Sequence, residues 1–267
     1  MSKRILITGS TDGIGLETAK LLISQGHQVL LHGRNSQKLE SVVHQLKTEF
    51  PEGMFESYVA DLSSMLQVKS LAQSVTARHE TLDVLINNAG VFKAPNPITK
   101  SGLDLRFVVN TIAPWLLTKK LLTILPTDGR VINLSSAAQS TVDLEALAGK
   151  RKLNDGEAYA QSKLGITMCT RFLADKIGSD GPAIIAINPG SFLGSKMVKE
   201  AYGRKGKDLS IGAEILVRAS ISGEFASASG QYFDNDQGSF AQPHPDALDQ
   251  EKITQLIEAL DSLIDLG

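Results

Sequence analysis

Short apolar runs alternate with segments of helical periodicity along most of the chain, and no other feature of the sequence limits the fold as strongly. Seven runs have the length and the apolar, partly β-branched content of strands that are buried on both faces. They are residues 4–8, 28–32, 55–60, 82–86, 130–134, 183–187 and 230–233. This alternation predicts an α/β fold with a doubly wound, parallel sheet of about seven strands, helices on both faces and right-handed crossovers.

Helical segments fill most intervals between these runs, because their apolar residues recur three and four positions apart. Gly26 suits the C-terminal cap of the first helix, Ser36 suits the N-cap of the second, and Pro126 closes the long fourth helix. The expected helices are 14–26, 36–46, 64–78, 103–125, 158–177 and 210–222.

The alternation ends after Pro189. Residues 191–208 contain three glycines and five basic residues without a sustained period, which predicts a flap over a binding site with a short helix near 195–202. Its apolar lining would come from Phe192, Met197, Val198 and Tyr202. Residues 246–266 predict an amphipathic C-terminal cover helix. Its apolar side holds Leu248, Ile253, Leu256, Ile257, Leu260, Leu263 and Ile264. We find no internal repeat or linker, so we expect residues 1–267 to form a single domain.

Composition and charge exclude several classes of protein. The 27 Lys and Arg residues nearly balance the 29 Asp and Glu residues, so the net charge of −2 offers no footprint for nucleic acid. Cys169 is the single cysteine, which excludes an intrachain disulfide and favours a buried side chain over a nucleophile. The five histidines lack metal-ligand spacing, so we expect no metal. The first apolar run is too short for the core of a signal peptide. No run reaches the length of about 18 apolar residues that a transmembrane helix needs. We therefore expect a cytoplasmic protein without a membrane partner.

Three glycines join the first strand to the first helix in Thr8-Gly9-Ser10-Thr11-Asp12-Gly13-Ile14-Gly15. Glycines permit a tight turn and close backbone approach, and the N-terminus of the following helix attracts phosphate groups. The spacing differs from the common G-x-G-x-x-G, and a plain glycine turn is the alternative. The position between a strand and a helix favours a site for the pyrophosphate of a dinucleotide.

This turn resembles the T-G-x-x-x-G-I-G fingerprint of the short-chain dehydrogenase/reductase family, and further family motifs follow in order. They are Asn87-Asn88-Ala89-Gly90 after the fourth strand, Asn110 in the next helix, Ser135-Ser136 after the fifth strand, Tyr159 with Lys163, and Asn188-Pro189-Gly190 after the sixth strand. The matches span residues 4–190, about 70% of the chain. The resemblance implies a single-domain Rossmann fold and an oxidoreductase that uses a nicotinamide cofactor on a carbonyl or alcohol substrate.

The resemblance also implies which residues bind the cofactor. They are Gly9, Ser10, Thr11, Asp12, Gly13, Ile14, Gly15, Arg34, Asn35, Asp61, Leu62, Asn88, Ala89, Gly90, Tyr159, Lys163, Pro189, Gly190, Ser191 and Leu193. Asp61 would accept a hydrogen bond from the adenine amino group, and Leu62 would line the adenine pocket. NAD-preferring relatives carry an acid at the position of Gly33, where it binds the ribose 2′-hydroxyl. Without that acid a 2′-phosphate is not repelled, and Arg34 supplies a matching cation. We therefore predict NADP(H) in preference to NAD(H), which stays the alternative.

Tyr159 and Lys163 are four residues apart and share one face of a helix. A tyrosine with a pKa of about 10 is a poor proton donor at neutral pH, and a nearby ammonium lowers that pKa. The pair therefore suits general acid–base catalysis, with Tyr159 protonating the oxygen of a carbonyl that receives a hydride.

Two further catalytic residues follow from the resemblance. Ser136 would donate a hydrogen bond to the reacting oxygen, and the adjacent Ser135 is the alternative. Asn110 would hold a water that links Lys163 to solvent. The alternative role for Asn110 is that of a hydrogen-bonded polar residue in a helix kink.

The chain departs from the commonest pattern in two places. Ser136 and Tyr159 are 23 residues apart, about twice the separation in many relatives, and the extra segment 141–157 either shapes the substrate pocket or is purely structural. This spacing, together with Ser162-Lys163-Leu164, resembles the retinol-dehydrogenase-like branch, which also contains the WW-domain oxidoreductases.

The second departure concerns the nicotinamide. Gly194 stands where many relatives place a threonine that binds the carboxamide. Ser195, or backbone groups of Ser191 and Leu193, would have to take its place.

Similar proteins form homodimers or homotetramers through two long helices, here 103–125 and 158–177. Leu116, Leu117, Leu121 and Met168 would serve that interface or the core of one chain. The C-terminal helix would disfavour a tetramer if it covered the substrate pocket. Two other functions compete. A non-catalytic NAD(P)-binding redox sensor commonly lacks the Tyr or the Lys, and a sugar-nucleotide epimerase or dehydratase usually carries G-x-x-G-x-x-G and a larger C-terminal domain.

Overall fold

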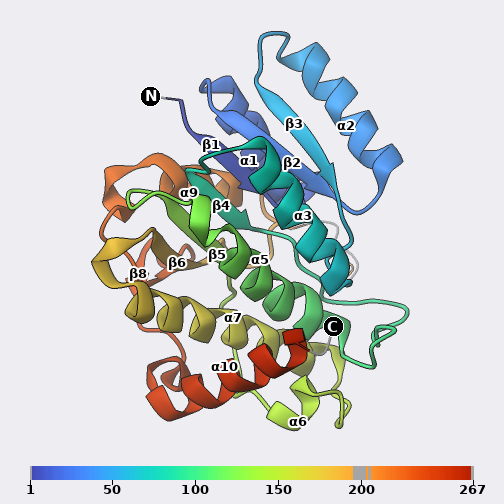
Figure 1. Cartoon of the computed structure of the whole chain (residues 1–267), viewed down its shortest axis with the longest axis vertical. Helices are drawn as coiled ribbons and strands as arrows, with labels where there is room; N and C mark the ends of the chain where they lie inside the picture. Colours follow the sequence, from blue (N-terminus) through green and yellow to red (C-terminus); the bar gives the residue numbers. More distant parts are fainter. Residues whose placement is uncertain (1, 195–202, 204–205, 266–267) are drawn as a thin grey trace.

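Eight strands form one sheet in the order β3-β2-β1-β4-β5-β6-β7-β8, and the first seven of these are parallel. The computed structural model describes residues 2–194, 203 and 206–265. The strands are β1 (Arg4–Ile7), β2 (Gln28–Gly33), β3 (Phe55–Val59), β4 (Val84–Asn87), β5 (Arg130–Leu134), β6 (Ala183–Asn188), β7 (Tyr232–Asp234) and β8 (Ser239–Ala241). The predicted α/β fold with a doubly wound, parallel sheet is therefore confirmed (Figure 1). The short antiparallel strand β8 was not predicted.

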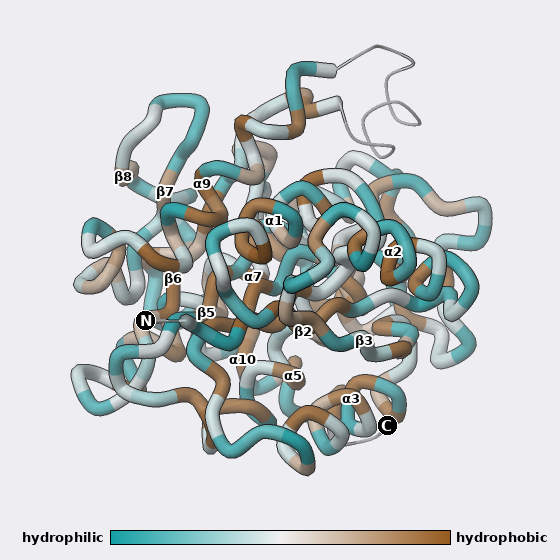
Figure 2. The backbone as a smooth tube through the Cα atoms, turned by 90° about the horizontal axis from the view of Figure 1, so that it is seen from above, coloured by the Kyte–Doolittle hydropathy of each residue, from teal (hydrophilic) through white to brown (hydrophobic). Residues whose placement is uncertain are grey.

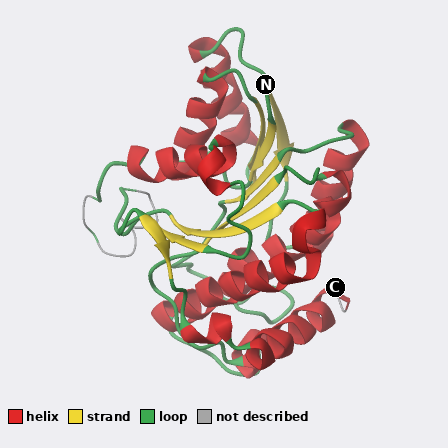
Figure 3. Cartoon of the chain, turned by 90° about the vertical axis from the view of Figure 1, so that its left-hand side faces the viewer, coloured by secondary structure: helices red, strands yellow, loops and turns green. Residues whose placement is uncertain are grey.

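Helices cover both faces of this sheet, as Figure 3 shows. The longer ones are α1 (Gly13–Ser24), α2 (Ser36–Glu49), α3 (Met65–Arg78), α5 (Ala113–Leu121), α7 (Asp155–Ile177), α9 (Ser210–Ile221) and α10 (Gln250–Asp265). Side chains of α1, α2 and α9 pack with Ile5 and Ile7 of β1, whereas those of α3, α5 and α7 pack with Leu6. Successive residues of a strand point to opposite faces, so a continuous apolar run fills both cores. In Figure 2 the backbone tube is brown, the colour of hydrophobic residues, at strand β6.

The predicted long helix 103–125 is present from Leu105 to Ile124, but its hydrogen-bond pattern is not regular throughout. It consists of α4 (Leu105–Phe107), the π-helical turn η1 (Val108–Ile112), α5 and the 3₁₀ turn η2 (Leu122–Ile124). Pro114 lies at the start of α5 and has no N–H to donate to the carbonyl of Asn110 one turn earlier. A proline inside a helix therefore explains why the regular pattern is interrupted here.

Two predicted helix ends also need correction. Asn35, and not Ser36, is the N-cap of α2, because its side chain accepts a hydrogen bond from the backbone N–H of Lys38. The C-terminal helix begins at Gln250, after a separate 3₁₀ turn, η5 (Pro245–Leu248). Leu248 belongs to that turn and is 49% exposed, so it does not join the apolar side of the helix. The predicted helix near 195–202 lies outside the described residues.

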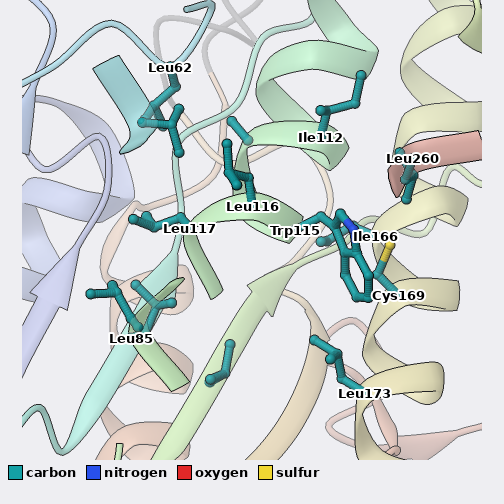
Figure 4. Close-up of a cluster of buried hydrophobic side chains, with 14 of the residues drawn as sticks. Leu62, Leu85, Ile112, Trp115, Leu116, Leu117, Ile166, Cys169, Leu173 and Leu260 are labelled. Atoms are coloured by element: carbon teal, nitrogen blue, oxygen red, sulfur yellow. The ribbon is translucent and has the colours of Figure 1, made fainter. Parts of the chain in front are cut away.

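The C-terminal helix α10 lies along α7 (Figure 1) and buries its apolar side there. Leu260 lies in the same apolar cluster as Ile166 and Trp115 (Figure 4). Trp115 donates a hydrogen bond from Nε1 to Asp261 at 2.7 Å, and Lys119 pairs with the same carboxylate at 2.8 Å. The predicted cover helix therefore covers α7. Cys169 is buried in this cluster, and burial raises the pKa of its thiol, as the sequence interpretation expects.

Candidate active site

The glycine turn after β1 packs against the loop after β4. Gly9 has a φ of +67°, and a Cβ atom there would lie 2.9 Å from Cα of Ala89. A Cβ at Gly15 would lie 2.4 Å from Nδ2 of Asn88. Nδ2 of Asn88 donates hydrogen bonds to the carbonyls of Thr8 and Gly9 at 2.8 and 3.1 Å. The Asn88 side chain and the glycines therefore fix the shape of this turn.

The N-terminus of α1 leaves hydrogen-bond donors for a ligand. The Asp12 side chain caps the helix by accepting from the N–H of Gly13 at 2.8 Å. Within the described part of the chain, the N–H groups of Ile14 and Gly15 have no protein acceptor. Free N–H groups and the positive end of the helix dipole suit an anion, and so this turn fits the pyrophosphate of a dinucleotide.

His32, at the end of β2, supports the same turn, and the sequence interpretation missed it. Its Nδ1 accepts a hydrogen bond from the N–H of Gly9 at 3.1 Å, and its Nε2 lies 3.0 Å from the carbonyl of Ala60. Nε2 must therefore carry the proton. Burial lowers the pKa of His32 to about 4, so the imidazole is neutral at physiological pH. A histidine within an apolar strand was the only signal for this role.

The end of β2 carries no acid at position 33, and the Thr11 side chain packs close to Gly33 there. A Cβ atom at Gly33 would lie 2.5 Å from the methyl group of Thr11. Arg34 follows and is exposed, with no ion pair to any described residue. The side chain of Asn35 is engaged in capping α2. Lys38, on the first turn of α2, brings a second cation to this edge, where it pairs with Asp12 at 2.6 Å.

The predicted adenine contacts lie after β3. The Asp61 carboxylate accepts a hydrogen bond from the N–H of Ser63 at 2.9 Å, which stabilises the loop that leads to α3. Leu62 is 5% exposed and belongs to the apolar core. Asp61 therefore stabilises its own loop, in addition to the predicted role of accepting a hydrogen bond from adenine.

The first turn of α7 is anchored at two points, and Tyr159 follows directly. Asn154 and Glu157 form a capping box, in which each side chain accepts from the backbone N–H of the other. Asp155 pairs with Arg106, which is 1% exposed and also pairs with Asp104 at 2.6 Å. These contacts tie the start of the helix to α4 and so hold Tyr159 in place.

Tyr159 and Lys163 do lie together on α7. Nζ of Lys163 is 5.6 Å from the ring centroid of Tyr159 and donates a hydrogen bond to the carbonyl of Leu134 at 2.7 Å. Phe92 packs edge-on against the Tyr159 ring, with centroids 4.8 Å apart. Lys163 is 4% exposed, and burial lowers its pKa to about 8. The side chain therefore remains mostly protonated at neutral pH and places positive charge beside the tyrosine.

The two serines after β5 have different surroundings. Ser135 is 3% exposed, and its hydroxyl lies 2.7 Å from Oγ1 of Thr167 and 3.1 Å from the carbonyl of Lys163. Ser136 is half-buried, and its hydroxyl accepts a hydrogen bond from the N–H of Ala138 at 3.1 Å. Ser135 thus joins β5 to α7, which leaves Ser136 better placed to meet a ligand.

Asn110 lies in η1 and is 2% exposed. Its amide group exchanges two hydrogen bonds with the backbone of Val91 and donates a third to Ser162 Oγ at 2.9 Å. The side chain therefore has the structural role that was the alternative. Its backbone carbonyl lacks the donor that a regular α-helix supplies four residues later, because that residue is Pro114.

The loop after β6 departs from the expected clamp. Ser191 donates from its N–H to the Asp236 carboxylate at 2.9 Å, and its hydroxyl binds the same group. Leu193 is buried near Gly212, whereas Phe192 is 57% exposed and has a φ of +58°. The Ser191 N–H expected to serve the nicotinamide is therefore engaged within the protein. Phe192 does not line a closed pocket in this structure, and the other predicted flap residues lie outside the described ranges.

The extra segment before Tyr159 contains α6 (Leu144–Leu147), where Ala146 and Leu147 are buried in the core. The Asp143 side chain caps this helix, and the N–H of Asp143 donates a hydrogen bond to Oε1 of Gln161 on α7 at 2.9 Å. These contacts show a structural role for the segment. In the described residues no group of three or more His, Cys, Asp or Glu side chains could hold a metal ion, and no helix has the length and apolar character to cross a bilayer.

Comparisons with known proteins show the family of this chain. The family model described as short chain dehydrogenase matches residues 3–205. Human retinol dehydrogenase 13 is 30% identical over 273 residues, which cover 95% of this chain and 82% of that protein.

Two solved structures extend the likeness to the fold. An uncharacterised protein from Mycobacterium paratuberculosis superposes with a TM-score of 0.81 at 24% identity, covering 98% of this chain and 93% of the other. A short-chain dehydrogenase from Shigella flexneri, complexed with NADP, gives a TM-score of 0.70 at 26% identity, covering 88% of this chain and 97% of the other. The chain belongs to the short-chain dehydrogenase/reductase family of oxidoreductases, in its retinol-dehydrogenase-like branch.

Proposed function

We propose that this chain is an NADP(H)-dependent oxidoreductase that interconverts a carbonyl and an alcohol, with Tyr159 as the general acid and base. The observation that carries this proposal is the buried Lys163 ammonium, 5.6 Å from the Tyr159 ring, at the carboxyl edge of the sheet beside the glycine turn. The cofactor, when bound, supplies or takes up the hydride. An NADP-complexed relative at 26% identity supports a nicotinamide site.

The residues divide the proton chemistry between them. The positive charge of Lys163 favours the phenolate form of Tyr159 and so suits it to exchange a proton with the substrate. Tyr159 then gives its proton to the carbonyl oxygen, and Ser136 donates a second hydrogen bond that stabilises the developing charge. The carbonyl of Asn110 would hold the water through which the proton is replaced from solvent.

The preference for NADP(H) rests on the end of β2. Gly33 places no carboxylate where it would repel a 2′-phosphate, and the exposed Arg34 can bind that phosphate. We expect kcat/KM to be higher with NADPH than with NADH, and Arg34→Ala to reduce that ratio by about tenfold, the worth of one charged hydrogen bond. Arg151→Ala, which removes an exposed arginine paired with Asp143, is the control and should leave the ratio unchanged.

The experiment that tests the activity is a screen of NADPH oxidation with aldehydes, ketones, quinones and retinoids. Tyr159→Phe should abolish turnover and leave NADPH binding intact. Tyr58→Phe is the matched control. The Tyr58 hydroxyl, on β3, forms a hydrogen bond with His79 after α3 and contacts none of the proposed catalytic residues. NADPH binding without turnover of any substrate by the unaltered protein would favour the redox-sensor alternative.

Assembly and location stay predictions. Leu116, Leu117, Leu121 and Met168, which we considered for a dimer interface, are all at most 2% exposed within one chain. A homodimer or homotetramer would therefore pair through other residues, or α10 would have to move from α7. Light scattering distinguishes these states. We also retain cytoplasmic location as a prediction, to be tested by fractionation of cells.

A further inference from the structure

Strand β7 and the turn after it bind the loops that carry the proposed active site. Tyr232, at the start of the strand, donates a hydrogen bond from its hydroxyl to the carbonyl of Ser136 at 3.2 Å. Gln139 donates to the same carbonyl at 2.9 Å. Tyr232 is 6% exposed, so this contact is part of the interior. A residue of β7 therefore helps to fix the backbone of Ser136, the proposed substrate-binding serine.

Asp234, two residues further along β7, contacts the last residue of β6, Asn188. Asn188 is 1% exposed and donates from Nδ2 to Asp234 at 2.8 Å and to Asp236 at 3.0 Å. Its Oδ1 accepts from the N–H of Gly190 at 3.3 Å. Asn188 therefore links the carboxylates of Asp234 and Asp236 to the backbone of Gly190 by hydrogen bonds.

Asp236 makes the densest set of contacts. Its carboxylate accepts from the N–H and the hydroxyl of Ser191 and from Asn188, and it lies 3.7 Å from Nζ of Lys207. Burial alone would raise the pKa of this carboxyl, but the hydrogen bonds from Ser191 and Asn188 and the Lys207 charge outweigh it, so the pKa lies below its ordinary value. Asp236 therefore stays ionised and accepts all these donors at neutral pH.

The same carboxylate joins two chain segments that pair directly. The N–H of Lys207 donates to the carbonyl of Phe192 at 2.8 Å, and the N–H of Gly194 donates to the carbonyl of Lys207 at 2.7 Å. A Cβ atom at Gly194 would lie 2.9 Å from that Lys207 carbonyl, so glycine permits the close approach. Asp236 contacts Ser191 on one segment and Lys207 on the other, which fixes their pairing.

We propose that Asp236 is a positioning residue for cofactor binding, because it fixes residues 189–193 where this loop would meet the nicotinamide. The inference rests on the proposed function. Asp236→Asn keeps the size of the side chain but replaces an acceptor by an N–H₂ donor, which then faces donors of Ser191 or Asn188. The loop should lose its fixed position, whereas Tyr159 and Lys163 on α7 keep theirs.

The test measures the Kd of NADPH by its fluorescence on binding, and KM and kcat with a substrate from the screen. Asp236→Asn should raise Kd and the KM for NADPH on the order of tenfold, the value of one charge-assisted hydrogen bond, and leave kcat at saturating NADPH within about twofold. Glu224→Gln is the control, because it removes an exposed carboxylate paired with Arg218 just before β7 and contacts no loop of the site. It should change neither constant.

A double-mutant cycle with Ser191→Ala separates positioning from direct contact. If the Ser191 hydroxyl acts through Asp236, its removal weakens NADPH binding in the unaltered protein and has no further effect in Asp236→Asn. Should Asp236→Asn fail to fold, Lys207→Met takes its place in the cycle, since it removes the cation 3.7 Å from the Asp236 carboxylate and should likewise raise Kd and retain kcat.

Three results would overturn the inference. They are an unchanged Kd in both single variants, additive effects of the two substitutions, and a fall of kcat and thermal stability without a change in Kd. All three leave the proposed function standing. A lack of NADPH binding by the unaltered protein would instead refute the proposed function, and the inference with it.

Discussion

The buried imidazole of His32 makes the stability of the fold depend on pH in a defined way. His32 is 2% exposed, accepts a hydrogen bond from Gly9 on Nδ1 and must be neutral to do so. Its pKa is about 4 in the folded chain and about 6.5 in an unfolded one. Between these values the unfolded chain binds the additional proton, and so the free energy of unfolding decreases as the pH falls from 6.5 toward 4.

The size of this effect follows from the two pKa values. Relative to pH 7.5, linkage gives a loss of about 2 kcal/mol at pH 5 and about 3 kcal/mol at pH 4 from this one group. His27 and His79 also have lowered pKa values, because burial disfavours their charged forms, and they add to the total in the same direction. A comparison of two variants is therefore needed to isolate His32.

His32→Gln provides that comparison. A glutamine can accept from Gly9 and donate to Ala60, but it does not titrate. Urea denaturation at pH 7.5 and at pH 5 should show that the unaltered protein loses about 2 kcal/mol more than His32→Gln over this interval. All other groups are common to both proteins and cancel. Equal losses would refute the assignment of a neutral, buried imidazole beneath the glycine turn.

Three further predictions concern the active-site helix and the loop after β6. Arg106→Met leaves the buried Asp104 without its partner, so urea denaturation should show a loss of about 3–5 kcal/mol, and a loss below 1 kcal/mol would contradict the buried pair. Gly194→Thr forces a Cβ atom against the carbonyl of Lys207, so thermal denaturation should show a lower Tm and fluorescence titration a weaker affinity for NADPH, and unchanged values would show that the close approach is absent. Lys163 loses its proton above about pH 8, so kcat/KM for carbonyl reduction should fall there, and Lys163→Arg should move this decrease to higher pH in a pH–rate profile; an unshifted decrease would mean that another group titrates.

Much of the fold was predictable because it depends on local patterns. Ile5, Leu6 and Ile7 are each fully buried, and a short, β-branched apolar run of this kind is typical of a strand covered on both sides. The π-helical turn in the long helix also had a local signal in Pro114, because a proline has no N–H to donate to the carbonyl one turn earlier. The strand β8 had no local sequence signal, because Ser239–Ala241 is short and partly exposed.

The candidate site was predictable where its motifs are contiguous and not where distant segments meet. Tyr159 and Lys163 share a helix, so their spacing alone placed them together. Asp236 contacts Ser191 across 45 positions of the chain, and His32 contacts Gly9 across 23. Such contacts depend on the sheet order, in which β6 pairs with β7 and β1 with β2, and a single sequence contains no periodicity that reports them.

Transfer of deuterium tests the central claim most directly. Purified protein is given a reducible carbonyl from the screen and NADPH that carries deuterium at the transferred position of its nicotinamide ring, and the product alcohol is analysed by mass spectrometry. The account predicts an alcohol with one deuterium on the former carbonyl carbon, and no such product from Tyr159→Phe although that variant still binds NADPH. Equal deuterium transfer by both proteins would contradict the role given to Tyr159, and none by either would contradict the proposed activity.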